Sequence, residues 1–189
     1  MKSLVFITGN PHKFEVAKNS LGSMGYEAIW ERLDVPEIQS MDVVEVALYS
    51  AKWAAEQLGR PVTLMDAGYY IEALNGFPGP FIKFINKWLS SEDLLKLMTG
   101  KTNRNVVMKF CLAYCEPGKS PVHFLSEVHG TIAQKAFKSD KVGVTPIDEI
   151  LIPEGFDKTD SQIPREEMIE FWSKTESYWK GLAEHLNGK

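Results

Sequence analysis

The segment at residues 3–15, SLVFITGNPHKFE, constrains the fold of this chain more than any other stretch. An apolar, β-branched run at residues 4–7 stops at Thr8-Gly9-Asn10, and a helical pattern follows. A strand that ends in a small polar turn at a helix start presents free backbone N–H groups and the positive end of the helix dipole, which together favour an anion such as phosphate. Gly9 allows close backbone approach, whereas Thr8 and Asn10 add short donors and Lys13 lies one turn into the helix. The alternative interpretation is an ordinary strand-to-helix turn with Asn10 as the cap.

Composition limits the class of protein. The 189 residues are 44% hydrophobic and 24% charged, as in a soluble globular domain. The net charge of −4 argues against a nucleic-acid polymer as the main partner, but allows one nucleotide in a locally basic pocket. The chain enters a strand directly after Lys2 and contains no apolar run of membrane-spanning length, so we expect a cytoplasmic protein with no membrane partner. Cys111 and Cys115, four apart in a predicted strand, are expected to be buried free thiols.

Hydrophobic periodicity predicts an α/β layered core in the first third of the chain. Strands are expected at residues 4–7, 26–30 and 62–65, the last one ending at Asp66. A helix is expected through residues 14–21 and a longer one from Met41 to residue 58. The predicted buried face of the longer helix is formed by Val44, Ala47, Leu48, Ala51, Ala55 and Leu58.

The rest of the chain changes character. A rigid loop at residues 76–80 precedes two short helices near 81–88 and 92–98, and strands at 106–114 and 122–132 form a hairpin around the turn at 116–121. One last helix is predicted from residue 168 to 186, with a stripe that we interpret as core packing: Met168, Phe171, Trp172, Thr175, Tyr178, Trp179, Leu182 and Leu186. No repeat or linker interrupts the sequence, which predicts a single domain over residues 1–189.

Candidate chemistry gathers where the predicted elements end. Ligands of open α/β sheets bind outside the carboxyl ends of the strands, so Asp66 and the Thr8 turn should share one rim. A carboxylate pair, Glu37 and Asp66, beside a phosphate cradle is the arrangement used by phosphoryl chemistry that depends on Mg²⁺ or Mn²⁺. Each acid also has a simpler interpretation, Glu37 as a solvated loop residue and Asp66 as a turn or cap.

The order and spacing of these motifs resemble those of the inosine triphosphate pyrophosphatases over essentially the whole chain. The matching residues are Thr8-Gly9-Asn10 with Lys13, Pro36-Glu37, Asp66 with Gly68, Gly76-Phe77-Pro78-Gly79, Gly130 with Ile132, Gly143, Pro146, and Pro153-Glu154-Gly155 before Thr159. The resemblance implies hydrolysis of nucleoside triphosphates to monophosphates and pyrophosphate. It also implies an elongated α/β fold of two lobes, with a mixed sheet, flanking helices, a nucleotide cleft between the lobes and a homodimeric assembly.

The resemblance also implies roles for individual residues. Lys13 and Asp66 would be catalytic, with Asp66 as the candidate base that orients water, and Glu37 and Asp66 would bind the metal. Residues that would bind the substrate are Thr8, Gly9, Asn10 and Lys13 at the triphosphate, Phe77, Pro78 and Gly79 at the border of the cleft, and Lys174 on the last helix.

The departures from the family pattern are concentrated where the base would be recognised. The acid before and the hydroxyl after the catalytic aspartate are replaced by Met65 and Ala67, and a helix lysine by Ser50. The aromatic-Gly-aromatic-Asp-Pro motif is present as Val142-Gly143-Val144-Thr145-Pro146. On the last helix, Ser-His-Arg is replaced by Trp172-Ser173-Lys174, and a lysine by Met168.

These observations predict a divergent nucleoside triphosphate pyrophosphatase with an altered base pocket. Two alternatives stay open: a nucleotide-binding or regulatory protein that has lost turnover, and a pyrophosphatase for pyrimidine or modified nucleotides.

Overall fold

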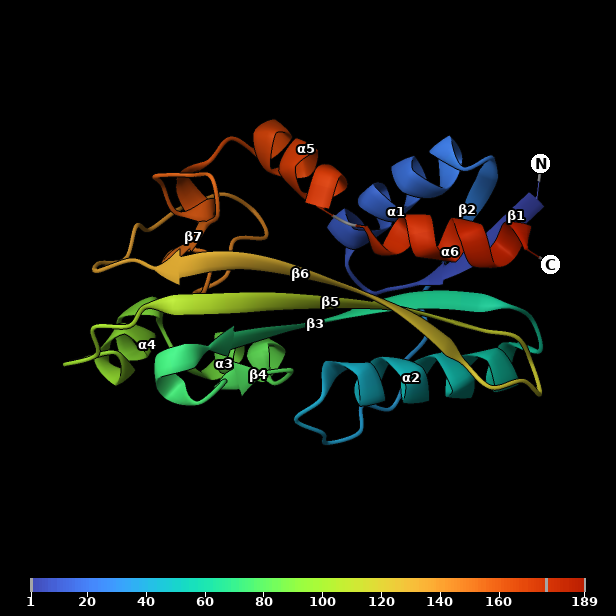
Figure 1. Cartoon of the computed structure of the whole chain (residues 1–189), viewed down its shortest axis with the longest axis horizontal. Helices are drawn as coiled ribbons and strands as arrows, with labels where there is room; N and C mark the ends of the chain where they lie inside the picture. Colours follow the sequence, from blue (N-terminus) through green and yellow to red (C-terminus); the bar gives the residue numbers. More distant parts are fainter. Residues whose placement is uncertain (1, 176, 189) are drawn as a thin grey trace. The chain divides into compact units, whose positions relative to one another are not determined.

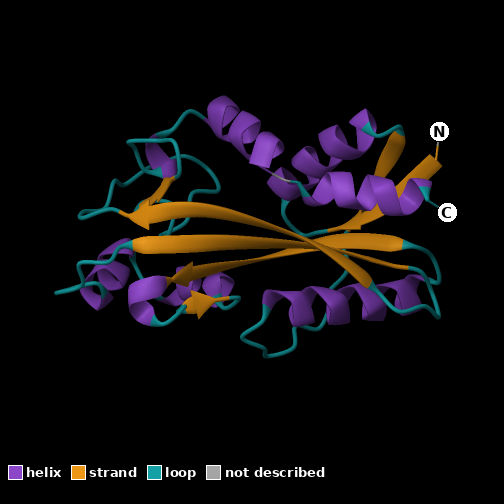
Figure 2. Cartoon of the chain, viewed as in Figure 1, coloured by secondary structure: helices purple, strands orange, loops and turns teal. Residues whose placement is uncertain are grey.

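The computed structural model describes residues 2–175 and 177–188, apart from the side chains of His12 and Ser173. The chain is a mixed α/β fold in which helices flank a seven-stranded sheet of order β2-β1-β3-β5-β6-β7, with β4 paired to β3 (Figures 1 and 2). The elements are β1 (Lys2–Ile7), α1 (Pro11–Ser23), β2 (Tyr26–Glu31), α2 (Val43–Leu58), β3 (Val62–Ile71), η1 (Glu72–Leu74), β4 (Pro78–Gly79), α3 (Ile82–Trp88), α4 (Ser91–Leu97), β5 (Asn105–Cys115), β6 (Val122–Ile132), β7 (Leu151–Pro153), η2 (Asp160–Gln162), α5 (Arg165–Thr175) and α6 (Tyr178–Asn187). In the described part of the chain, no helix combines the length and the apolar character needed to cross a membrane.

The chain divides into two compact units. The first comprises Met1–Asp66, Phe110–Ser126 and Ser173–Lys189, and the second comprises Ala67–Lys109 and Glu127–Trp172.

In the first unit, helices cover both faces of a parallel sheet. β1 pairs in parallel with β2 and β3, and Figure 1 shows α1 and α6 over one face and α2 over the other. Val5 and Ile7 belong to the apolar core that includes α2, whereas the Phe6 ring lies 5.9 Å from the ring of Trp179 on α6. This coverage explains the continuous apolar run of β1, because a strand buried on both faces needs no polar alternation.

Helix α2 begins and ends at residues that its sequence specifies. The Asp42 side chain accepts a hydrogen bond from Val44 N, and Gly59, at φ 61°, ends the helix in the left-handed conformation. The buried face is shifted from the predicted one. It comprises Val43, Val46, Ala47, Ser50, Ala51, Ala54 and Ala55. Val44, Leu48 and Leu58, which were predicted to lie on that face, are only partly buried.

The second unit carries the shorter elements. β4 pairs antiparallel with β3, and β7 pairs antiparallel with the end of β6. Helix α4 begins with a capping box in which the side chains of Ser90 and Asp93 bond each other's backbone N–H groups. Neither β4 nor β7 was predicted, because strands of two or three residues leave no periodic signal.

The prediction that the strand beginning at residue 62 ends at Asp66 is wrong. β3 continues to Ile71, so Asp66 lies within the strand. The extension is stabilised by partners far along the chain, since Tyr69 pairs with Gly79 and β5 lies on the other side of β3. Local polar residues therefore suggested an end that long-range pairing overrides.

The prediction of one last helix from residue 168 to 186 is also wrong. The structure has two helices, α5 and α6, and Ser177 N donates to Thr175 O at 2.9 Å, a contact that is not part of an α-helix. The predicted stripe is nevertheless buried at Met168 in one unit and at Tyr178, Trp179 and Leu182 in the other. The prediction of two buried free thiols, Cys111 and Cys115, is confirmed.

Candidate active site

The turn between β1 and α1 is built by its own short side chains. Thr8 Oγ1 accepts a hydrogen bond from Asn10 N at 3.0 Å, and Asn10 Oδ1 accepts one from Lys13 N at 3.4 Å. Asn10 is therefore the N-cap of α1, and Pro11 occupies the first helical position, which proline favours. Gly9 and Asn10 are exposed, so the backbone at the positive end of a thirteen-residue helix faces solvent. This geometry is suited to an anion.

Lys13 connects this turn to the strand that carries Asp66. Its Nζ donates to Met65 O at 3.2 Å, across 52 residues of sequence. The parallel register pairs Ile7, the last residue of β1, with Leu64. The turn after β1 therefore lies beside the residues that follow Leu64. The turn, the Lys13 ammonium and the backbone beside Asp66 are thus brought together, although Asp66 lies inside β3 and not at its end.

The acids near this edge influence a buried thiol. Burial, together with the carboxylates of Asp66 and Asp42, raises the pKa of Cys111 to about 12. Cys111 lies on β5, next to β3 in the sheet, so its proximity to Asp66 fits the strand order. A thiol with this pKa stays protonated at neutral pH and is not a nucleophile.

The second predicted metal ligand, Glu37, is exposed on the segment between β2 and α2. Among the described residues, no group of three or more His, Cys, Asp or Glu side chains is arranged to hold a metal ion. Mg²⁺ is usually held by one or two carboxylates and completed by phosphate oxygens and water. The carboxylates of Glu37 and Asp66 therefore suit an ion that arrives with a phosphorylated substrate. An ion held by protein ligands alone would need more donors than these two side chains.

The predicted loop at Phe77, Pro78 and Gly79 lies in the second unit and is partly a strand. Pro78 and Gly79 form β4 and are buried, whereas Phe77 is 37% exposed. Gly79 has φ 58°, and a Cβ there would lie 3.4 Å from both Gly76 O and the Tyr70 ring, so only glycine fits without strain. The predicted rigidity therefore comes from pairing with β3 and from contact with Tyr70. Lys174, the remaining predicted contact, is exposed near the end of α5.

The segment that replaces the family's base-recognition motif uses its polar groups internally. Thr145 N and Oγ1 both donate to Asp148 Oδ2, each at 2.7 Å. Asn86 of α3 donates to Thr145 Oγ1 at 3.1 Å and accepts from Ile147 N at 3.2 Å. Val142 is 96% exposed and packs on nothing substantial. In this unit the segment is a braced turn that presents neither an aromatic ring nor the acid of the family motif.

Comparison with known proteins identifies the family. A family model described as the Ham1 family matches residues 4–176. A dITP/XTP pyrophosphatase of Methanopyrus kandleri is 40% identical over 174 residues, which cover 92% of this chain and 91% of the relative. The chain belongs to the Ham1 family.

Other relatives and structures agree with this assignment. A dITP/XTP pyrophosphatase of Methanosarcina acetivorans is 38% identical over 149 residues, covering 79% of this chain and 81% of that protein. The Ham1 protein of Staphylococcus aureus superposes with a TM-score of 0.77 at 23% identity, covering 99% of each chain. A HAM1 protein of Coxiella burnetii gives 0.79 at 21% identity over 100% of each chain, and both structures confirm the fold.

Two residues of this Ham1 protein that sequence reasoning did not single out lie against the turn. Trp30 Nε1 donates to Thr8 O at 2.8 Å, and its ring is stacked on Phe14 at 4.8 Å. The Arg32 guanidinium lies over the same ring, 4.5 Å from its centre. The available signal was positional: Arg32 directly follows the end of β2 and is two residues from Trp30, the spacing that places side chains on one face of an extended chain.

A partly buried acid pair in the second unit, Asp148 and Asp160, was also missed. Burial, and then repulsion from Asp148, raises the pKa of Asp160 to about 7, against the opposing effect of Lys141. Burial also raises the pKa of Asp148. The pKa of Tyr69 is raised by burial and by both carboxylates. The Lys141 ammonium donates to Ser161 O and Ile163 O, 2.9 Å each, and so lies beside η2. One proton on this pair is therefore gained or lost near neutral pH.

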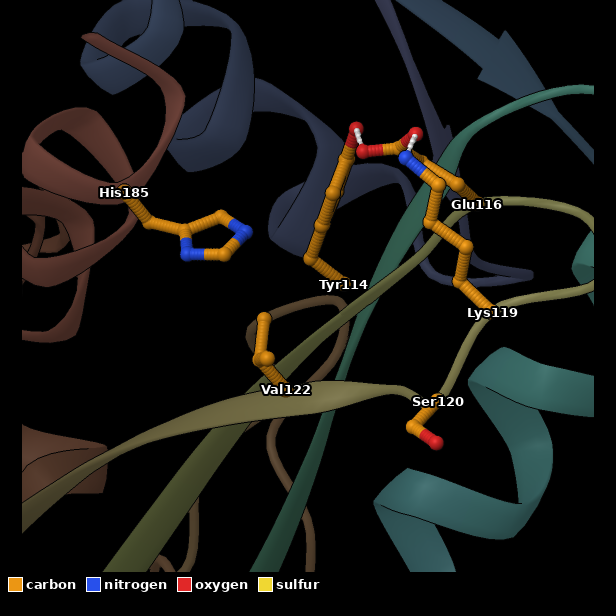
Figure 3. A pocket seen from close by; sticks show the side chains of 6 residues that line it. All are labelled: Tyr114, Glu116, Lys119, Ser120, Val122 and His185. Atoms are coloured by element: carbon orange, nitrogen blue, oxygen red, sulfur yellow. Dashed lines mark hydrogen bonds and ion pairs between the residues drawn. The ribbon is translucent and has the colours of Figure 1, made fainter. Parts of the chain in front are cut away.

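A small pocket lies elsewhere in the first unit, at the turn between β5 and β6 and beside α6 (Figure 3). Tyr114 donates to Glu116, which also pairs with Lys119, and His185 faces them from α6. The pocket encloses about 50 Å³, too little for a nucleotide, and contains none of the predicted site residues. It is not the candidate active site.

Proposed function

We propose that this Ham1 protein hydrolyses nucleoside triphosphates to nucleoside monophosphates and pyrophosphate. The observation that carries the proposal is the hydrogen bond from Lys13 Nζ to Met65 O, because it sets a solvent-facing phosphate turn beside the strand of Asp66. Family membership supports the same activity, and the names of the relatives make dITP and XTP the first substrates to test.

Different residues of the chain bind the phosphates and activate the attacking water. The exposed backbone at Gly9 and Asn10 and the Lys13 ammonium bind the phosphates, where charge-assisted hydrogen bonds are strongest. Asp66 accepts a proton from the attacking water and holds that water in line with the phosphorus. The roles of Phe77, Pro78, Gly79 and Lys174 stay predictions, as do the homodimer and the cytoplasmic location.

Glu37 and Asp66 are the carboxylates that would hold a divalent cation, Mg²⁺ or Mn²⁺. When bound, such an ion neutralises charge on the phosphate oxygens and makes the phosphorus easier to attack. The support for this role is chemical, because one or two carboxylates completed by phosphate oxygens and water are the usual ligands of Mg²⁺.

A specific observation favours a second candidate, a nucleotide-binding protein without turnover. Ser50 and Met168 replace lysines of the family pattern, and both are buried, with exposed fractions of 4% and 5%. Neither position presents a cation to a phosphate. Met65 and Ala67, on either side of Asp66, likewise offer no polar side chain to a metal or water.

The base preference is inferred from the braced turn at residues 142–148. Because Thr145 is bonded to Asp148 and the exposed Val142 has no ring to stack on a base, we infer base selectivity that is weak or redirected, toward pyrimidine or modified nucleotides.

The test is a product analysis with dITP, XTP and a pyrimidine triphosphate, each with Mg²⁺ and with Mn²⁺. Pyrophosphate and orthophosphate are quantified separately, together with the nucleotide product. Equal amounts of monophosphate and pyrophosphate are expected. Release of orthophosphate and a nucleoside diphosphate would contradict the proposal, and nucleotide binding without any product would select the second candidate.

A further inference from the structure

We propose that Arg32 is a second cation of the phosphate site, held in position by Trp30; the inference rests on the proposed function, because it assigns a residue to the same triphosphate. It starts from the strand order, in which β1 lies between β2 and β3. The phosphate turn follows the middle strand. Lys13 reaches toward β3, where its Nζ bonds Met65 O, and this leaves the β2 side of the turn to be considered.

Arg32 lies on that side, at the level of the turn. The parallel register pairs Ile7 with Glu31, and Thr8 N donates to Glu31 O at 3.2 Å. The next residue of each strand, Thr8 on one and Arg32 on the other, therefore lies at the same edge. Lys13, which belongs to α1, therefore lies toward the β3 side of the turn, and Arg32, directly after β2, lies toward the other side.

The position of Arg32 is set by the Trp30 ring, on which both the Phe14 ring and the Arg32 guanidinium are stacked. We call these three side chains the column. The Phe14 and Trp30 rings are stacked at 4.8 Å with only 13° between their planes, which covers one face of the indole. The guanidinium lies 4.5 Å from the centre of the same ring, so it takes the other face. The indole N–H bonds Thr8 O, and this contact fixes the column to the turn itself.

The Arg32 guanidinium still has donors to offer. Among the side chains and backbone that the structure describes, which exclude the side chains of His12 and Ser173, its contact is the Trp30 ring, and its N–H groups make no hydrogen bond or ion pair. Arg32 is exposed, so a ligand can reach it. A guanidinium over a ring keeps its in-plane N–H groups available, and their fork matches two phosphate oxygens. A triphosphate with several negative charges is the ligand that such a pair of flanking cations fits.

The test measures binding of inorganic triphosphate by calorimetry at one fixed Mg²⁺ concentration, without turnover. Arg32→Gln should weaken binding about tenfold, and the dependence of affinity on salt should become less steep. Arg32→Lys should recover part of the loss, since it keeps the charge but not the fork. The matched control is Arg60→Gln, which removes an equal charge from an exposed residue just before β3, on the N-terminal side of the β3 residues that pair with β1. This control should bind as the wild type does.

The role of Trp30 is tested by a double-mutant cycle. Trp30→Leu should weaken triphosphate binding several-fold in the wild-type background and much less in the Arg32→Gln background, because Trp30 acts largely through Arg32. In kinetics, Trp30→Leu should raise KM with kcat changed less than about twofold. Equal losses in both backgrounds would show that Trp30 does not position Arg32.

Each outcome separates this inference from the proposed function. If wild type, Arg32→Gln and Arg60→Gln bind triphosphate equally, Arg32 has no phosphate role and the proposed function is unaffected. If only Arg32→Gln is impaired but the wild type releases no pyrophosphate, the inference stands and the proposed function fails. Failure of the wild type to bind triphosphate would overturn both.

Discussion

The phosphate turn at residues 8–13 and the braced turn at residues 142–148 are built in opposite ways. In the first, a cap and a glycine leave the backbone of a helix start exposed, with Lys13 held beside β3. In the second, the polar side chains of Thr145, Asp148 and Asn86 bond one another. A site made of backbone tolerates sequence change, whereas a site made of side chains is lost when those side chains change or find other partners.

This contrast gives a physical reason for our proposal that the chain keeps one half of a nucleotide-recognition pattern and has changed the other. Thr8, Gly9 and Asn10 need only be small and able to cap, and they satisfy that need locally. Base recognition needs particular rings and charged groups at particular places, and in this chain those positions hold Val142, Val144 and Thr145. The predictions below test the two halves in turn.

The largest effect is expected from Asp66→Asn. It removes the charge that would bind the metal and accept the proton of water, so pyrophosphate release should fall by at least about a hundredfold. Turnover is measured beside thermal unfolding, with exposed Asp140→Asn as the control for the loss of one carboxylate. A folded Asp66→Asn protein that retains turnover would remove Asp66 from the mechanism.

Lys13→Ala tests the phosphate half directly. Loss of a charged contact should weaken binding of a nucleoside triphosphate by about ten- to a hundredfold, with little effect on the corresponding nucleoside. The control is Lys18→Ala, an exposed lysine further along α1. Calorimetry with both ligands separates the cases, and equal losses for triphosphate and nucleoside would place Lys13 away from the phosphates.

A smaller effect is expected on the pH dependence of folding stability, through Asp160 in the unit that carries the braced turn. Burial, with repulsion from Asp148, raises the pKa of Asp160 from its ordinary value of 3.8 to about 7. Between these values the folded state holds a proton that the unfolded state has released, so stability should fall as pH rises from about 4 to 7. Asp160→Asn should flatten this dependence and add roughly 1–2 kcal/mol at pH 8, where the wild-type carboxylate is ionised in both states.

Urea unfolding at pH 5 and pH 8 measures this change, and exposed Asp157→Asn provides the control. If wild type and Asp160→Asn lose stability in parallel as the pH rises, then Asp160 is not the group that titrates.

Much of the fold follows from local signals in the sequence. Residues 4–7 and Gly59 mark a buried strand and a helix end on their own, and the structure has both. The prediction failed where distant partners decide: β3 passes Asp66 because of its pairing with β4 and β5, and the aromatic stripe near the C-terminus belongs to two helices in two units. The family and the α/β class are confirmed, since they rest on motifs spread along the whole chain.

The candidate site, like the fold, was predictable where its residues are adjacent in sequence and not where distant segments meet. The turn at Thr8 and its cation Lys13 are adjacent in sequence, so their pattern is visible without a structure. The contacts of Trp30 and Arg32 depend on the register between β1 and β2, and the pKa of Asp160 depends on burial beside Asp148. The two-residue spacing of Trp30 and Arg32 suggests a shared face but not the contact with the turn, and no spacing encodes the pKa of Asp160.

The central claim is that the phosphate half is retained and the base half is altered. It is tested most directly by kcat/KM for the inosine, xanthosine, guanosine, adenosine and pyrimidine triphosphates, scored as pyrophosphate released at one Mg²⁺ concentration. We expect pyrophosphate from several of them, with less than about a tenfold preference for inosine over adenosine triphosphate, since an ordinary pocket contact contributes about 1–3 kcal/mol. A preference of about a hundredfold or more for the inosine or xanthosine substrate would contradict the account, because it would require a base pocket as complete as the phosphate turn.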